Sequence, residues 1–597
     1  MCGVIGFNWD DKTLLKKLSN IIEHRGPDDV ALYTDRHYSL GMRRLAILDL
    51  KKGLYPIYNE SETILTVFNG ELYNYKKIRA ELIKLGHKFK TDCDAEIIPH
   101  AYEEYGPLFV NKINGMFAIC LYDLVKKKLF LFRDRLGIKP LYYYFEGKRF
   151  AFCSEIKALL VIPKFQKEIN ESALNNYFTF RYVPGEDSIF SKIKKVLPGH
   201  YLEFDGKIKI KKYWDLHFSK NNNSLEKNAI YVKNLLEHSV KRRLMSDVPL
   251  GAYLSGGLDS SAIVALMSKH SNNVNTFNVS FSDSEFDESK YAQIVADEFN
   301  TNHEVIDVDV NAIDTLPKVA YHLDEPLADA ATIPTYLMSQ QTKKKVTVVL
   351  SGEGSDELFA GYERYRHMNA AFKFKHVPKF IRNIPSKIKS DNIVFNRGKE
   401  VLSKLDKPKD AFLSYFTFFN DKDKKLLYSK NINKKNYDLN EYFGKSIFNS
   451  MLKLDVKERL PGNMLLKNDK MTMAASLEAR VPFLDHELVE FSSKIPFNQK
   501  ITLFKDKLVY RESIKKIVPK IIYKRKKTGF TVPTSAWVKE GLKDHLFDLV
   551  EQNKEPYLNK NYIKKISDKV HKHFYYKRQF WSILMYEQWY NEFMVKR

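Results

Sequence analysis

The segment Leu254-Ser255-Gly256-Gly257-Leu258-Asp259-Ser260-Ser261 decides the fold class of the larger part of this chain. It follows an apolar run at 249–254 that is typical of a buried strand, and it opens an apolar run at 258–269 that is typical of a helix. Its glycines let the backbone approach a phosphate group, and the free N–H groups at a helix N-terminus favour an anion. Asp259 would repel that phosphate unless a cation lay between them, so the segment indicates a nucleotide site with Mg²⁺. From composition alone, an ordinary glycine-rich turn capped by Asp259 is the alternative.

Strands and helices alternate on both sides of this segment. A helix is expected at 226–244, and strands are expected at 275–281, 303–308 and 346–350, separated by helices at 288–299 and 332–343. Such alternation predicts a doubly wound parallel sheet with helices on both faces. Helices dominate from about residue 362 onward, so 225–597 is interpreted as one α/β domain with helical additions.

The first part of the chain has a different pattern, with many short strands. The runs 63–68, 116–122 and 128–132 are apolar, which is typical of sheets covered on both faces. A helix is expected at 75–85, and three pairs are expected to form turns: Asn69-Gly70, Glu146-Gly147 and Asp205-Gly206. The pattern predicts a layered α/β domain at 2–212, followed by a polar linker at 215–224.

The chain begins Met1-Cys2-Gly3-Val4-Ile5-Gly6. Removal of Met1 would leave Cys2 with both a thiol and a free α-amino group, and that amine has a pKa of about 8, so it can act as a base near neutral pH. Attack by the thiolate on an amide carbonyl would give a thioester. Taken by itself, a Met-Cys start also fits a small buried residue in an N-terminal strand.

The composition limits the classes of partner. The 597 residues include 97 Lys and Arg and 73 Asp and Glu, a formal net charge of +24, but no segment interleaves basic and aromatic residues as RNA-binding proteins do. The four cysteines, Cys2, Cys93, Cys120 and Cys153, form no Cys-x-x-Cys pair, so they suggest neither a zinc site nor an iron–sulfur site. No apolar run reaches the ~18 residues that cross a bilayer, and no signal peptide is recognisable. We therefore expect a cytoplasmic protein that binds neither nucleic acid nor membrane.

Several motifs together resemble one known family. Ser-Gly-Gly-Leu-Asp-Ser-Ser at 255–261 resembles the pyrophosphate loop of the ATP pyrophosphatases, and Leu-Ser-Gly-Glu-Gly-Ser-Asp-Glu-Leu-Phe-Ala-Gly-Tyr at 350–362 forms a second block at a strand end. In this order after Met-Cys-Gly, and with the blocks at 476–485 and 526–530, they resemble glutamine-hydrolysing asparagine synthetases over nearly the whole chain. The resemblance implies an αββα N-terminal-nucleophile glutaminase domain at 2–212 and an ATP-pyrophosphatase domain at 225–597.

The resemblance also implies roles for residues of the glutaminase half. Cys2 matches the nucleophile, and the Asn69 side chain and the Gly70 backbone N–H match the oxyanion hole. Arg44 matches the arginine that holds the glutamine α-carboxylate, and Asp94 matches the acid that binds the α-ammonium. Without this context, Asn69-Gly70 would be a plain hairpin turn, Arg44 a surface ion-pair residue and Asp94 a helix cap. The family block at 24–28 is interpreted as mainly structural around the pocket.

In the other half, the resemblance implies that Asp259 and Asp356 bind Mg²⁺ and pyrophosphate. Glu353 matches an acid of the amidation step, and Lys526 aligns with a lysine that neutralises phosphate charge, with Lys527 as the alternative. The residues expected at the nucleotide are Leu254, Ser255, Gly256, Gly257, Asp259, Ser260, Val279, Ser351 and Gly352.

The implied reaction amidates L-aspartate to L-asparagine with ammonia from glutamine, through β-aspartyl-AMP, and releases glutamate, AMP and pyrophosphate. A sibling amidotransferase that acts on another carboxylate, such as a sugar uronate, shares the same motifs and stays open. A tRNA-modifying ATP pyrophosphatase would share the 255–261 loop but would not need an N-terminal cysteine domain. The implied substrates are glutamine, aspartate and ATP, with Mg²⁺ as cofactor and a second copy of the chain as partner in a homodimer. The segment Pro461-Gly462-Asn463-Met464 departs from the acidic residues of many relatives.

Overall fold

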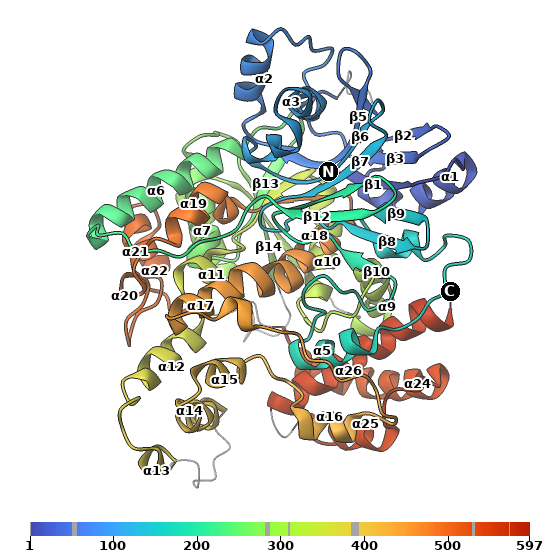
Figure 1. Cartoon of the computed structure of the whole chain (residues 1–597). Helices are drawn as coiled ribbons and strands as arrows, with labels where there is room; N and C mark the ends of the chain where they lie inside the picture. Colours follow the sequence, from blue (N-terminus) through green and yellow to red (C-terminus); the bar gives the residue numbers. More distant parts are fainter. Residues whose placement is uncertain are drawn as a thin grey trace.

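The structure, a computed structural model, describes residues 2–50, 56–280, 287–307, 311–383, 393–527, 532–571 and 574–596. Figure 1 shows the sheets of the N-terminal part at the top, the parallel-sheet region in the middle and a helical region at the bottom. Within the described ranges, no helix combines the length and the apolar character needed to cross a membrane.

The N-terminal part contains two six-stranded antiparallel sheets, with the strand orders β10-β8-β9-β1-β3-β2 and β12-β11-β7-β6-β5-β4. The first sheet consists of β1 (Cys2–Phe7), β2 (Asp29–Thr34), β3 (Ser39–Arg44), β8 (Tyr142–Glu146), β9 (Arg149–Cys153) and β10 (Ile193–Lys195). The second consists of β4 (Ile57–Tyr58), β5 (Ile64–Leu72), β6 (Gly115–Asp123), β7 (Lys128–Arg133), β11 (His200–Phe204) and β12 (Ile208–Lys212).

Alternate side chains of the two sheets meet in a buried core. Val4 and Met42 of the first sheet pack in one cluster with Val67 and Leu131 of the second, because successive strand residues point to opposite faces. One helix packs on the outer face of the first sheet and two pack on the outer face of the second: α1 (Lys12–Ile21), α2 (Tyr75–Lys84) and α3 (Ile97–Tyr105). These four layers confirm the predicted αββα fold.

One predicted turn is wrong. Asn69 and Gly70 lie inside β5, opposite Ala118 and Phe117 of β6. A Cβ atom at Gly70 would lie 2.1 Å from the backbone oxygen of Met116, so glycine is needed here for close approach of two strands, not for a turn. The pairs Glu146-Gly147 and Asp205-Gly206 do connect strands, and their glycines have φ of +62° and +97°.

The C-terminal part is built on a five-stranded parallel sheet with the order β15-β14-β13-β16-β17. Its strands are β13 (Leu250–Tyr253), β14 (Asn275–Ser280), β15 (Asn302–Asp307), β16 (Val348–Leu350) and β17 (Glu478–Arg480). The helices around it include α6 (Leu225–Arg242), α7 (Leu258–Ser268), α8 (Ser289–Glu298), α9 (Ala312–Leu323) and α10 (Thr332–Lys343). Separate apolar clusters, one containing α6, α7 and α8 and one containing Met338 of α10, cover the two faces. The predicted doubly wound sheet is therefore confirmed.

The strand order creates a topological switch point. The chain passes from β13 through α7 to β14 on one side, whereas β16 lies on the other side of β13. In such sheets a crevice opens at the carboxyl ends of the two diverging strands. The segments that begin at Leu254 and Ser351 follow those two ends.

The helical region closes against both parts of the molecule. The C-terminal helix α26 (Phe574–Tyr590) shares a cluster with α5 (Glu171–Phe180), and Tyr177 donates a hydrogen bond to the Ser582 carbonyl at 2.7 Å. A further helix, α18 (Leu465–Met473), packs against α9 and α10 and precedes β17. The sequence patterns missed β17 because it is three residues long and follows more than a hundred residues of mainly helical chain.

Two candidate active sites

Cys2 lies at the start of β1, where its side chain is buried next to β5. The Cys2 backbone N–H donates a hydrogen bond to Asn69 Oδ1 at 3.0 Å. Asn69 Nδ2 is also buried and makes no hydrogen bond within the described part of the chain. A thiol beside an amide donor with no partner can attack a carbonyl group whose oxygen accepts from that donor. Burial raises the pKa of the Cys2 thiol, so the attacking thiolate requires a base.

Arg44 and Asp94 flank these residues. Arg44 is the β3 partner of Cys2, and its Nη2 donates to the Leu48 and Asp49 carbonyls at 3.1 and 2.8 Å. Asp94 begins a short 3-10 helix (Asp94–Glu96) and accepts a hydrogen bond from the N–H of Leu72, the last residue of β5, at 2.8 Å. Burial raises the pKa of Asp94 to about 6. The five predicted glutaminase residues are thus connected through β1, β3 and β5. Met1 lies outside the described residues.

A charge cluster beside this site was missed by the sequence prediction. Glu71 of β5 pairs with Arg480 of β17 at 3.0 Å, and Arg480 pairs with Glu478 at 2.6 Å, all three buried. Burial opposes ionisation of Glu478, but the Arg480 guanidinium and other nearby positive charges, Lys139 among them, together lower its pKa. Strand β17 therefore brings charges of the parallel sheet next to β5, and the 476–485 block was the sequence signal for it.

Arg25 connects Cys2 with the other half of the chain. Its Nε donates to the Cys2 carbonyl at 3.2 Å, and its two Nη atoms pair with Glu155 and Asp469, each at 2.9 Å. Asp469 lies on α18, and Lys467 of the same helix lines the second candidate site. One helix therefore contacts both sites, through side chains two residues apart.

The second site is a cavity of about 290 Å³ at the carboxyl ends of β13 and β16. Every predicted nucleotide residue except Gly256 lines it, as do Glu353, Asp356, Lys526 and Lys527. Gly256 instead shapes the loop, because its φ is +65° and a Cβ atom there would lie 2.5 Å from Tyr291 Cβ. Arg525, which the prediction missed, also lines the cavity and donates to the Gly256 carbonyl at 3.1 Å.

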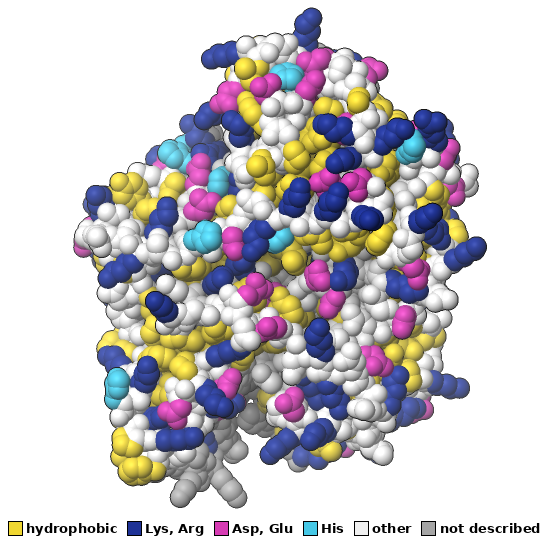
Figure 2. All heavy atoms as spheres, in the orientation of Figure 1, with side chains coloured by type: hydrophobic (Ala, Val, Ile, Leu, Met, Phe, Trp, Pro, Cys, Tyr) yellow, Lys and Arg dark blue, Asp and Glu magenta, His cyan; other side chains and the backbone are white. Residues whose placement is uncertain are grey.

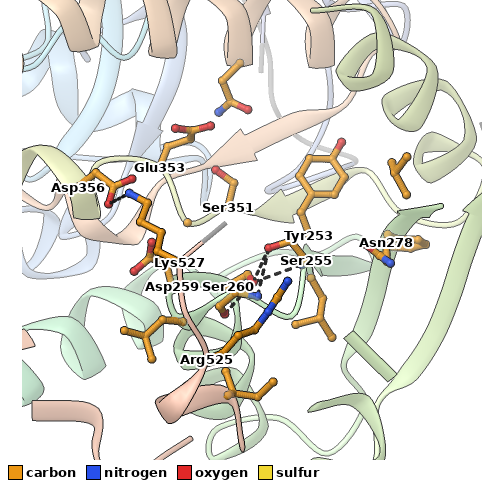
Figure 3. A pocket seen from close by; sticks show the side chains of 18 of the residues that line it. Tyr253, Ser255, Asp259, Ser260, Asn278, Ser351, Glu353, Asp356, Arg525 and Lys527 are labelled. Atoms are coloured by element: carbon orange, nitrogen blue, oxygen red, sulfur yellow. Dashed lines mark hydrogen bonds and ion pairs between the residues drawn. The ribbon is translucent and has the colours of Figure 1, made fainter. Parts of the chain in front are cut away.

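The two predicted metal-binding acids converge on one cation. Lys507 Nζ lies 2.7 Å from Asp259 Oδ2 and 2.6 Å from Asp356 Oδ1. Lys527 Nζ lies 2.6 Å from Asp356 Oδ1, and Figure 3 shows it reaching that carboxylate with Asp259 beside them. Burial opposes ionisation of Asp356, but Lys507 and Lys527 hold its pKa below the ordinary range. Lys507 was missed because no recognisable motif surrounds it. Thr528, Gly529 and Phe530 of the 526–530 motif lie outside the described residues.

A larger hollow of about 1220 Å³ adjoins this cavity. The two share Glu353, Asp356 and Lys467 in their walls. The larger one is also lined by Arg181, Asp329, Arg459, Asn463 and Met464, so the divergent 461–464 segment faces it. Lys467 pairs with Asp329 at 3.3 Å, and burial raises the pKa of Glu353. This hollow can receive a small molecule that carries groups of both charges.

The comparisons agree with this two-part arrangement. Residues 231–591 match the family model described as asparagine synthase, and residues 1–214 match that described as a glutamine amidotransferase domain. The chain is 34% identical to asparagine synthetase [glutamine-hydrolyzing] 1 of Bacillus subtilis (strain 168), over 100% of this chain and 98% of the relative.

Two further relatives carry the same name. Asparagine synthetase [glutamine-hydrolyzing] 3 of the same organism is 30% identical over 90% of this chain and 89% of the relative. Asparagine synthetase [glutamine-hydrolyzing] of Zea mays is 35% identical over 61% of this chain and 60% of the relative. The chain therefore belongs to the glutamine-hydrolysing asparagine synthetase family, whose enzymes carry out glutamine-dependent amidation.

Proposed function

We propose that this chain converts L-aspartate, glutamine and ATP into L-asparagine, glutamate, AMP and pyrophosphate. In this proposal residues 2–212 act as the glutaminase domain and 225–597 as the synthetase domain. The observation that carries it is the junction of the two hollows, where Glu353 and Lys467 belong both to the nucleotide cavity and to a charged hollow next to it. An acceptor bound there would lie beside the α-phosphate of ATP.

The first half-reaction takes place at Cys2. Its Sγ attacks the side-chain amide of glutamine, while Arg44 holds the α-carboxylate and Asp94 holds the α-ammonium. Asn69 Nδ2 and the Gly70 N–H donate to the oxyanion, and one such donor lowers the barrier by roughly 3 kcal/mol. Ammonia leaves, and water releases glutamate from the thioester. The unpartnered Asn69 Nδ2 supports this role.

The second half-reaction takes place at the nucleotide cavity. A β-carboxylate oxygen of aspartate attacks the α-phosphate, which forms β-aspartyl-AMP and releases pyrophosphate. The loop at 255–261 and a lysine, Lys526 or Lys527, receive the pyrophosphate charge; the contact between Lys527 and Asp356 supports Lys527. Ammonia then attacks the acyl carbon, the bond between that carbon and the phosphate oxygen breaks, AMP leaves, and Glu353 takes up the proton that this step releases.

Mg²⁺ fits the acidic pair in this cavity. Carboxylate oxygens of Asp259 and Asp356 approach the single Lys507 ammonium nitrogen at 2.7 and 2.6 Å, so they converge on one cation position. Magnesium is usually bound by one or two carboxylates together with substrate phosphates. We propose that these two residues hold Mg²⁺, which when bound offsets the charge of the pyrophosphate group.

The charges of the larger hollow support an amino acid as acceptor. Arg181, Arg459 and Lys467 are available for the α-carboxylate of aspartate. Asp329 and Glu353 supply carboxyl groups for its α-ammonium. A sugar uronate has no ammonium group, so it would make no ion pair with the carboxyl group of Asp329 or Glu353.

Ammonia must pass from Cys2 to the acyl carbon without gaining a proton. Met116 and Leu136 of the glutaminase part share an apolar cluster with Leu460 and Met473 of the other part. Apolar walls favour neutral ammonia over ammonium, because a buried unpaired charge is costly. We propose that the passage runs through this cluster.

Two further proposals concern the cellular setting. The described cysteines are all free thiols, which supports a reducing compartment such as the cytoplasm. We also propose that the chain forms a homodimer, which sedimentation of the purified protein tests.

The acceptor is tested with purified protein, glutamine, Mg²⁺ and ATP against a panel of carboxylates. The expected result is AMP and pyrophosphate with aspartate, together with asparagine. AMP and pyrophosphate only with another carboxylate would keep the adenylation and transfer the enzyme to the sibling class. ADP and phosphate would contradict adenylation itself.

A further inference from the structure

A group of possible metal ligands lies on the glutaminase part, outside both sites described above. Glu60, His87, His100 and Glu103 each offer one ligand atom, and these atoms all lie within 4.8 Å of one another. The four residues come from three segments: the turn between β4 and β5, the segment after α2, and α3. Figure 2 shows a histidine side chain among acidic side chains at the top of the molecule, over α2 and α3.

His100 is the residue that points to a ligand. Its side chain is fully buried, and neither ring nitrogen makes a hydrogen bond within the described ranges. Glu60 Oε2 lies 2.7 Å from its Nδ1, but the contact lacks the geometry of a hydrogen bond. Buried imidazole nitrogens usually have a partner, so the pair of unsatisfied nitrogens calls for an explanation.

The neighbours of the group are arranged as around a metal. Glu60 Oε1 lies 3.1 Å from His87 Nδ1, so one carboxylate faces both imidazoles. Glu96 Oε1 lies 4.0 Å from His100 Nε2, on the ring nitrogen that does not face Glu60. Asn59 Nδ2 donates to Glu103 Oε2 at 2.8 Å. Outer carboxylates and amides of this kind typically orient metal ligands.

We propose that these four side chains bind Zn²⁺. Two imidazole nitrogens and two carboxylate oxygens suit zinc, whereas Mg²⁺ and Ca²⁺ prefer oxygen ligands alone. Tetrahedral bonds of about 2.0–2.2 Å place ligand atoms about 3.4 Å apart, so the longer separations in the group must shorten and the 2.7 Å contact between Glu60 and His100 must lengthen. Glu60 and Glu103 are exposed and can move inward. The cysteine pattern carries no signal for this site, because its ligands are histidines and glutamates.

Zinc would hold together the turn between β4 and β5, the segment after α2, and α3. The helix α3 directly follows Asp94–Glu96, the 3-10 helix that carries the proposed ligand of the glutamine α-ammonium. The site is therefore structural: it would stabilise the segment that positions Asp94 and would take no part in the chemistry.

The test uses the full chain without an affinity tag, in a Cys2→Ala background so that Zn²⁺ cannot bind the nucleophilic thiol. Zinc chloride is titrated calorimetrically, and bound metal is measured after dialysis. We expect one Zn²⁺ per chain, a thermal midpoint raised by about 3 °C or more, and an X-ray absorption spectrum with two nitrogen and two oxygen ligands.

Two substitutions at partly exposed positions, His87→Ala and Glu103→Gln, should each weaken Zn²⁺ binding at least about tenfold. The matched controls His238→Ala on α6 and Glu81→Gln on α2 should bind as the parent does. Absence of binding to the parent protein overturns the proposal. So does binding with unchanged affinity and stoichiometry in both the His87 and the Glu103 variants.

Discussion

The proposed glutaminase site and the proposed nucleotide site are built in opposite ways. At Cys2 most of the functional groups lie on paired strands, their side chains are buried, and the Asn69 amide already has a donor without a partner among the described residues. At the nucleotide cavity the groups lie on loops at strand ends, and the Asp259 and Asp356 carboxylates are paired with Lys507 and Lys527. The first site is preorganised for a neutral amide group, whereas the second must exchange ionic partners when a charged nucleotide binds.

This difference has a consequence for substitutions. Removing a group from the preorganised site leaves its surroundings intact, so the loss falls on one half-reaction. Removing either acid leaves Lys507 with one carboxylate partner instead of two, and removing Asp356 also takes away the acidic partner of Lys527, so nucleotide binding and chemistry change together.

Cys2→Ala should separate the two sites completely. We expect glutamine-dependent synthesis to fall by at least about 10³-fold, because no other group can form the thioester. Synthesis from ammonium salts should continue near the parent rate. The measurement is asparagine formation with each nitrogen donor, and Cys120→Ala, a buried thiol in β6, is the control. Glutamine use by the Cys2 variant at the parent rate would exclude the nucleophile assignment.

Asp259→Asn and Asp356→Asn should give the converse separation. Each should lower pyrophosphate release by about 10²–10³-fold while glutamine hydrolysis persists, since the acids serve the charge balance of the other site. The double variant should lose little more than either single one, because both acids act on one cation. Asp314→Asn at the start of α9 is the control. Normal pyrophosphate release in either variant would remove that residue from the metal proposal.

Asp469→Asn tests whether the sites are coupled through α18. The substitution takes away one ionic partner of Arg25, the residue that donates to the Cys2 carbonyl. We expect the rate with glutamine to fall about tenfold and the rate with ammonium salts to fall less than about threefold, because Arg25 positions the nucleophile.

The informative quantity is the ratio of the two rates, measured together with the thermal midpoint. Glu23→Gln, which alters an exposed partner of Arg43, is the control. Equal losses with both nitrogen donors would show a general loss of stability and would contradict a positioning role for Arg25.

The pH dependence of glutamine binding should show the smallest effect. Burial raises the pKa of Asp94 to about 6, so at about pH 6 this carboxyl group is protonated and neutral in about half of the molecules. If its anion binds the α-ammonium, the KM for glutamine should about double between about pH 8 and about pH 6. The KM for ammonium salts, corrected for free ammonia, should not follow this titration. A flat KM for glutamine would argue against Asp94.

The same pKa has a consequence for stability. Because it is raised above the ordinary value of an aspartate, the folded state binds the proton more tightly than the unfolded state. Ionised Asp94 therefore lowers the free energy of unfolding above about pH 6, and this destabilisation disappears as the pH falls toward about 4. Asp94→Asn should then stabilise the fold at neutral pH by up to about 3 kcal/mol while it weakens glutamine binding. Denaturant unfolding of the variant and the parent at about pH 7 and about pH 4 measures this difference in the free energy of unfolding.

Those parts of the fold and the site that depend on a local sequence pattern could be predicted from the sequence. The loop after β13 and the block after β16 lie at the carboxyl ends of adjacent strands, so their meeting follows from the βα alternation alone. The positions of residues that depend on pairing between strands far apart in the sequence could not be predicted in this way. Asn69-Gly70 is a favoured turn pair, yet pairing with β6 and contact with Met116 keep it in a strand.

Lys507 and Arg25 illustrate a second limit. Lys507 lies in no recognised motif, and Arg25 lies in the 24–28 block, which indicated a structural role around the pocket but not its partners; both residues pair with acids more than a hundred positions away. Their partners, Asp259, Asp356 and Asp469, are reached only after the parallel sheet and α18 have packed. Ion pairs between distant segments leave no periodic signal in the sequence, so only the folded chain reveals them.

Adenylation of the carboxylate acceptor with ATP can be tested directly by isotope transfer. Aspartate labelled with ¹⁸O in its β-carboxylate is incubated with glutamine, Mg²⁺, ATP and the enzyme, and the nucleotide product is analysed by mass spectrometry. We expect AMP that carries one labelled oxygen, because the carboxylate oxygen that attacks the α-phosphate stays on phosphorus when ammonia displaces AMP. Unlabelled AMP, or ADP with labelled phosphate, would contradict adenylation.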